Sequence, residues 1–126
     1  MRAFAQLGLI TIFSLTIVFH TFVMMKIIPY AIVWGGRLKN DAAMYKFEAV
    51  SLVLNTTFLF VVLLKSTYLN IQVPITILDT ILWVMAGLFL LNTIGNLMSK
   101  NRMERLLFTP ITLILSLFLF IVLLNY

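Results

Sequence analysis

Few side chains in this sequence could do chemistry, and the ionisable ones of interest stand inside long apolar runs. His20 lies in the first run, and Glu48 lies near the start of the second. An imidazole titrates near neutral pH, so it can exchange a proton with a carboxylate that lies within about 3 Å. Ionisable side chains are expensive inside a membrane helix, which makes both residues candidates for a functional site.

Amide and hydroxyl side chains extend this candidate site. Glu48, Ser51 and Asn55 have i, i+3, i+7 spacing and therefore share one helix face. Asn92 and Asn96 lie one turn apart in the third apolar run and can reach the same depth as His20. The predicted polar cluster comprises His20, Glu48, Ser51, Asn55, Asn92 and Asn96.

Two interpretations of this polar cluster stay open. In the first, the cluster is a path for protons or cations. In the second, weak hydrogen bonds tie the helices together, with Asn55 joining two of them. Glu48 would then complement the N-terminus of its own helix and pair with Lys46 or Arg37.

A second candidate site lies in the opposite half of the third run. Asp79 follows Pro74 by about a turn and a half of helix, and Trp83 comes one turn later on the same face. We expect the Asp79 carboxylate to reach water or lipid headgroups at that depth. The alternative is a cation or amine site to which Trp83 offers its π face.

The residue inventory excludes several kinds of chemistry. The 126 residues include no cysteine, one histidine and four acidic residues. Sites that hold zinc or a pair of iron ions need three or four N, O or S ligands, so no metal and no cofactor are predicted. Phosphate-binding, dinucleotide-binding, zinc-protease and serine-hydrolase motifs are also missing from the sequence.

The composition places most of the chain in lipid. Apolar residues make up 63% and charged residues 10% of the sequence, against about 45–50% and about 25% in soluble domains. Backbone groups in lipid must be paired within a segment, which favours helices of roughly 20 residues. We predict an all-α polytopic membrane protein, a single domain over residues 1–126, with four transmembrane helices in an antiparallel bundle. The expected spans are about 3–25, 46–65, 74–98 and 106–126.

Three prolines predict details of these spans. Pro29 predicts a kink in the first span, which continues along the membrane interface with Tyr30 and Trp34 at headgroup level and ends at Gly35–Gly36. Pro74 is expected as the first residue of the third helix. Pro110 is expected in or near the first turn of the fourth, where its missing N–H is harmless.

The basic residues predict an orientation. Seven of the nine Lys and Arg residues fall in the first and third connections between spans. The positive-inside rule places these connections in the cytoplasm and both termini outside. Contact with the lipid bilayer explains the net charge of +5 better than nucleic acid does. The sequence shows no targeting segment, which favours a prokaryotic plasma membrane. The seven basic residues are Lys26, Arg37, Lys39, Lys46, Lys100, Arg102 and Arg105.

Three functions fit these features. We favour a non-enzymatic membrane protein that acts through helix–helix contacts, as an assembly factor, immunity protein or regulator, with a membrane-protein partner or as a homo-oligomer. The second possibility is a small oligomeric transporter or channel that uses the polar cluster. The third is an intramembrane enzyme acting on lipid or quinone, with His20 and Glu48 as an acid–base pair. No nucleophile or metal set accompanies that pair, so an enzyme fits least well.

Overall fold

The computed structural model describes residues 1–32 and 38–124 of the chain. Within these residues every regular element is helical. The elements are, in order, α1 (Arg2–Met24), a 3-10 turn η1 (Tyr30–Ile32), α2 (Asp41–Lys65), α3 (Ile75–Leu97), a π-helical turn η3 (Glu104–Phe108) and α4 (Thr109–Leu124).

All four long helical segments can span a membrane. α1 and α3 have 23 residues and α2 has 25, while η3 and α4 together form an apolar segment of 21 residues. At about 1.5 Å per residue each segment covers the roughly 30 Å of a hydrocarbon core. The prediction of an all-helical polytopic membrane protein is therefore confirmed.

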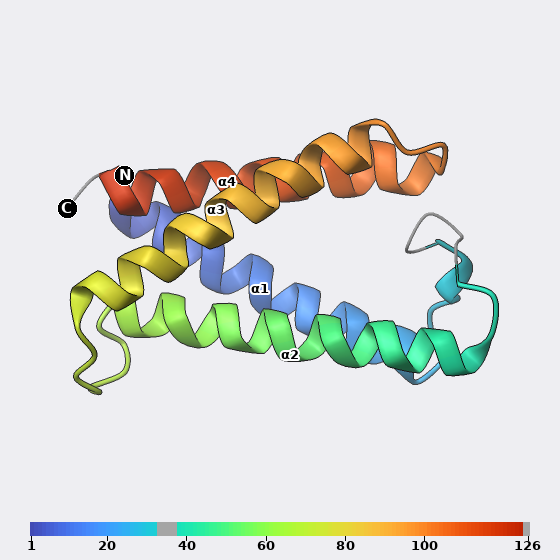
Figure 1. Ribbon diagram of the computed structural model, residues 1–126, viewed down its shortest axis with the longest axis horizontal. Helices are drawn as coiled ribbons and strands as arrows, with labels where there is room; N and C mark the ends of the chain where they lie inside the picture. Colours follow the sequence, from blue (N-terminus) through green and yellow to red (C-terminus); the bar gives the residue numbers. More distant parts are fainter. Residues whose placement is uncertain (33–37, 125–126) are drawn as a thin grey trace.

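Successive helices run in opposite directions along one long axis (Figure 1). The α1–α2 and α3–α4 connections lie together at one end, which we call the basic end because it carries Lys26, Lys39 and Lys100. The N-terminus, the α2–α3 connection and the end of α4 lie together at the other end, which we call the terminal end. The basic residues of two distant connections are thus brought to one end of the bundle.

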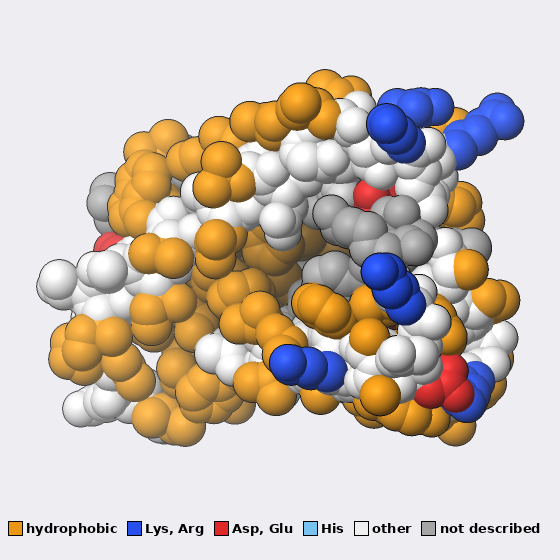
Figure 2. All heavy atoms as spheres, turned by 45° about the vertical axis from the view of Figure 1, so that its right-hand side comes forward, with side chains coloured by type: hydrophobic (Ala, Val, Ile, Leu, Met, Phe, Trp, Pro, Cys, Tyr) orange, Lys and Arg blue, Asp and Glu red, His pale blue; other side chains and the backbone are white. Residues whose placement is uncertain are grey.

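The bundle is built from two helix pairs. α1 packs mainly against α2, and α3 packs mainly against α4. α2 and α3 lie close at the terminal end, diverge towards the basic end, and contact each other least of the sequential pairs (Figure 1). Figure 2 shows a hollow between the two pairs, bordered by hydrophobic side chains.

Aromatic side chains join the two pairs in the middle of the bundle. Phe13, Phe58 and Phe89 come from α1, α2 and α3, and their ring centroids lie 5.7–6.0 Å apart. Such tilted and edge-on ring contacts are favourable beyond the area that they bury. Near the basic end the described residues form a small second cluster, in which Val23 and Met44 are buried. Packing between the pairs therefore weakens in the direction in which they diverge.

α1 ends at Met24, next to the end of the expected span at residue 25, and it does not continue beyond that point as predicted. Lys26 has a left-handed backbone with φ 62°, and its N–H donates to the carbonyl of Val23 at 3.0 Å, while the Ile27 N–H donates to Phe22 at 2.9 Å. This double hydrogen bond is a Schellman ending, which stops the helix. The predicted continuation through a kink at Pro29 is wrong, because a residue before proline disfavours helix and the chain has already turned. The predicted stop at Gly35–Gly36, and the placement of Trp34, lie outside the described residues.

α2 begins five residues before the predicted span. The side chain of Asn40 caps the helix by accepting a hydrogen bond from the Ala43 N–H at 2.8 Å. Asp41 follows in the first turn, where a negative charge suits the helix dipole. At the other end of the α2–α3 connection, Pro74 is the N-cap of α3 rather than its first residue.

The fourth span contains an irregular turn that hydropathy did not reveal. Pro110 lies at the second position of α4, but helical structure begins before it. A proline inside a helix lacks an N–H and clashes with the carbonyl four residues earlier. The chain widens here into the π-helical turn η3, in which the Thr109 N–H donates to Glu104, five residues back. Pro110 thus lies in the first turn of α4, as expected, but the helical segment of the fourth span already begins at Glu104, because the wide turn accommodates the proline ring without ending the helix.

Candidate functional site

A histidine–carboxylate pair links α1 and α2. His20 Nδ1 lies 2.5 Å from Glu48 Oε2. The side chain of His20 is 16% exposed and that of Glu48 is fully buried. Phe19 also packs edge-on against the His20 ring, with centroids 5.4 Å apart. The sequence placed both residues at one depth, and the structure brings them into direct contact.

The helix geometry explains how the two side chains meet. His20 lies four residues before the end of α1, and Glu48 is the eighth residue of α2. In an antiparallel pair both positions lie roughly 6–10 Å inside the basic end. The interior has a low dielectric, which strengthens the attraction between the two groups. The contact meets the distance criterion for acid–base or proton-exchange chemistry.

Asn55 does not join two helices, so that expectation is corrected. Its side-chain amide donates to the backbone carbonyl of Ser51 at 2.8 Å, one turn back in the same helix. Ser51 itself is buried, at 7% exposed. The structure pairs Glu48 with His20, and the side chain of Lys46, one of its two predicted partners, is exposed. Arg37 lies outside the described residues.

Asn96 belongs to a polar seam between α3 and α4. Its amide lies 3.4 Å from the Thr112 hydroxyl, and the Thr93 hydroxyl donates to the same Thr112 oxygen at 3.0 Å. One turn further on, the Ser116 hydroxyl donates to the Ala86 carbonyl at 3.0 Å. The predicted site does not include this seam, although the i, i+4 spacing of Thr112 and Ser116 gives the fourth span a mildly polar face.

Asn92 is the unexpected member of the polar cluster. Its side chain is exposed, and it makes no hydrogen bond to any residue that the structure describes. Gly95, three residues on, has no atom within 4 Å of the position that a Cβ would occupy. The amide of Asn92 therefore stands on an open face of a membrane-spanning helix, where nothing in the described chain satisfies it.

A buried ion pair joins α2 and α3 near the terminal end. Lys65 Nζ lies 2.7 Å from Asp79 Oδ1, with side chains 3% and 22% exposed. Trp83 instead packs edge-on against Phe120 of α4, with centroids 5.7 Å apart. Lys65 is not among the predicted site residues. Its place across a short connection from an acidic residue in an antiparallel helix was the signal for the pair.

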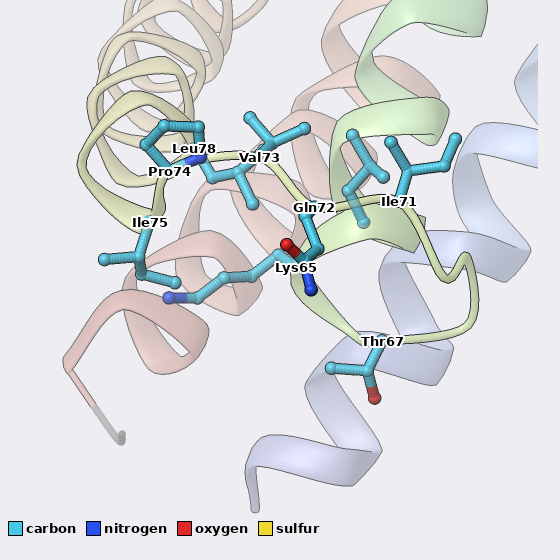
Figure 3. A pocket seen from close by; sticks show the side chains of 9 residues that line it. Lys65, Thr67, Ile71, Gln72, Val73, Pro74, Ile75 and Leu78 are labelled. Atoms are coloured by element: carbon cyan, nitrogen blue, oxygen red, sulfur yellow. The ribbon is translucent and has the colours of Figure 1, made fainter.

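An open pocket of about 630 Å³ lies beside this ion pair, at the α2–α3 connection. Figure 3 shows the Lys65 side chain extending towards Ile75, with Thr67 and Gln72 of the connection beside it. The remaining lining is largely apolar. Asp79 offsets the charge of Lys65, so the lining offers lipid or solvent mainly an apolar recess.

Exposed basic side chains mark the opposite end of the bundle. Figure 2 shows Lys and Arg side chains gathered there. Lys26 donates a hydrogen bond to Asp41, and this bond and the Coulombic attraction of Asp41 raise the pKa of Lys26 above its usual range. Loss of hydration is the largest cause that raises the pKa of Tyr30, and a hydrogen bond with Asp41 raises it further. The other described basic residues at this end are exposed: Lys39, Lys46, Lys100, Arg102 and Arg105.

The comparisons with protein-family models, with curated proteins and with solved structures find no match for this chain. The class that its own residues define is an all-helical, four-span integral membrane protein.

Proposed function

We propose that this protein is a non-enzymatic membrane protein that acts through helix–helix contacts, and that its contact surface is the face of α3 around Asn92. The observation that carries the proposal is the exposed amide of Asn92, which has no partner in the described chain. The residue lies five positions before the end of α3, so its side chain enters the hydrocarbon region by about 7 Å. We also propose that the basic end faces the cytoplasm, because its basic residues far outnumber those of the terminal end.

Desolvation of the Asn92 amide favours such a contact. An amide without a hydrogen-bond partner is unfavourable in hydrocarbon by several kcal/mol in the extreme case (about 4–8 kcal/mol for transfer to cyclohexane). A neighbouring transmembrane helix that supplies a donor or acceptor removes that penalty, with a measured net gain of about 0.6–2 kcal/mol per bond. Lipid tails cannot supply such a group. The Asn92 face is therefore better matched to a protein than to lipid.

The open face also has the right shape. The spans bury only 17–28% of their most apolar windows within the chain, so most of each helix surface is available to lipid or to partners. On α3, Gly95 leaves the backbone uncovered beside Asn92. Small residues at such positions let two helix backbones approach closely, which strengthens their dispersion contacts.

Photo-crosslinking in native membranes tests this proposal. A photoreactive amino acid replaces Leu88, one turn before Asn92, or Leu90 on the other side of α3. These positions are 44% and 42% exposed, so the control is matched in exposure. We expect a discrete protein adduct from position 88 only, and its loss in the Asn92→Leu variant. Equal adducts from both positions, or protein adducts from neither, would contradict the proposal.

The His20–Glu48 contact favours one other candidate function, a small transporter or channel that moves protons. A half-buried imidazole and a buried carboxylate 2.5 Å apart are suited to pass a proton between them. Glu48→Gln keeps the shape of the side chain and removes the exchangeable acid. Under this alternative, liposomes with the folded variant lose proton flux completely. Undiminished flux in a folded Glu48→Gln protein excludes the relay.

A further inference from the structure

We infer that the protein on the Asn92 face is a second copy of this chain, related by a two-fold axis along the membrane normal, so that the two Asn92 amides meet. This inference rests on the proposed contact function and names its partner. Three observations carry it: the self-complementary chemistry of the amide, the stripe on which it stands, and the constraint that a membrane places on symmetry.

Asn92 stands in a continuous stripe along α3. Leu88, Asn92 and Gly95 have i, i+4, i+7 spacing, which places them on one helix face. All three are exposed in the described chain. α3 has one ionisable residue, Asp79, and it is engaged with Lys65 at the other end of the helix. A helix that approaches this face therefore meets an uncharged surface with one polar group, the amide of Asn92, and uncovered backbone at Gly95.

The chemistry of that polar group favours an identical partner. A carboxamide has an NH₂ that donates and a carbonyl that accepts, so two asparagines facing each other satisfy both groups at once. An unrelated partner would need a donor and an acceptor at the same depth and register. A second copy supplies them by symmetry, as in any interface that pairs one patch with itself.

The membrane restricts how two copies meet. Both copies insert with the same orientation, so a two-fold axis between them must lie along the membrane normal. The two α3 helices then run parallel, and each residue near the axis faces its own counterpart at equal depth. Asn92 meets Asn92 and Gly95 meets Gly95, with no adjustment of register. An exposed amide beside an uncovered glycine is suited to this geometry.

Disulfide crosslinking of the purified full chain in lipid bicelles tests the inference, because the natural sequence contains no cysteine. Leu88→Cys lies about 40° round the helix from Asn92, and Leu90→Cys lies about 160° away, at 100° per residue. We expect oxidation to convert Leu88→Cys into a species of twice the 14.4 kDa chain mass and to leave Leu90→Cys monomeric. In the Leu88→Cys background, Asn92→Leu should weaken association by roughly threefold to thirtyfold. Asn92→Gln, which keeps the amide, should restore much of it.

Each other outcome has a definite meaning. Equal crosslinking at positions 88 and 90 would signify random collision and overturn the inference. A monomeric Leu88→Cys protein that still gives an adduct with a different protein in native membranes would overturn the second copy and leave the contact function standing. Absence of both products would overturn both. Asn92 has no partner in the described chain, so we expect these variants to fold, and unchanged helicity by circular dichroism checks this.

Discussion

Glu48 shows what a single side chain does for this bundle. Its carboxylate is fully buried and contacts the only histidine of the chain. A buried pair of this kind does not have to be stabilising relative to an apolar pair, but loss of one member removes a polar contact from the other. The pair therefore fixes which faces of α1 and α2 meet, whatever further role it has.

The first prediction follows from this contact. Glu48→Ala should lower the free energy of unfolding by about 1–3 kcal/mol, since a buried partner is removed and a small cavity is left. His20→Ala and the double variant complete a mutant cycle, with an expected coupling of about 0.5 kcal/mol or more. Unfolding by SDS in mixed micelles provides the measurement. Thr57→Ala is the control, because that exposed hydroxyl bonds only to its own helix. Strictly additive effects would contradict a direct contact.

Thr67 offers a prediction of the opposite sign. Thr67 follows α2 and has a left-handed backbone with φ 62°. A β-branched residue adopts this conformation only with steric strain, which glycine avoids. The same Schellman ending that closes α1 occurs here, since Thr67 donates to Leu64 and Tyr68 donates to Leu63. Thr67→Gly should stabilise the protein by about 1 kcal/mol, because glycine adopts this backbone without a steric penalty. Thermal unfolding in detergent measures it. Thr67→Ala keeps the Cβ and should gain much less; an equal gain would refute the backbone argument.

The ends of the helices depend on capping interactions that a hydropathy profile does not detect. Asn40 caps α2 with its side chain, ahead of the apolar run that defines the span. Asn40→Ala should destabilise the first turn of α2 by about 1 kcal/mol, whereas Asn40→Asp should retain the cap. Hydrogen exchange of the amides at residues 41–44 measures this locally. Unchanged protection in Asn40→Ala would show that the cap contributes nothing.

The four spans could be predicted from sequence because hydrocarbon thickness fixes their length and composition. The turn that follows α1 and the irregular turn before α4 could not be predicted, because they depend on local backbone geometry. Lys26 adopts the left-handed backbone that glycine usually takes after a helix, and the chain accommodates Pro110 by widening the turn that precedes it. Either turn can form next to many different sequences, so the pattern of apolar residues does not predict it.

The candidate site was predictable in parts. Depth counted along each helix placed His20 and Glu48 together, and the structure agrees. Rotation of each helix about its own axis was not predictable, and it separates Asn96, which bonds to Thr112, from the exposed Asn92. The amide of Asn55 donates its hydrogen bond within its own helix. Residue spacing alone does not distinguish such a bond from one between two helices.

For the molecule as a whole, orientation is the most direct prediction. Asn70→Cys lies in the α2–α3 connection at the terminal end, and Met98→Cys lies at the basic end with the native residue 78% exposed. Neither change removes a charge. In intact cells a membrane-impermeant maleimide should label position 70 and leave position 98 unlabelled until the membrane is opened. The reverse pattern would invert the proposed topology.

The division into two helix pairs has a consequence for biosynthesis. α1 and α2 are complete once Lys65 has been added, and their contact through His20 and Glu48 needs nothing made later. α3 and α4 hold each other through their own hydroxyl seam. Each hairpin can therefore leave the insertion machinery as a finished unit, and docking through Phe89 comes last. A nascent chain halted just after the α2–α3 connection would already hold its histidine and its buried acid in contact.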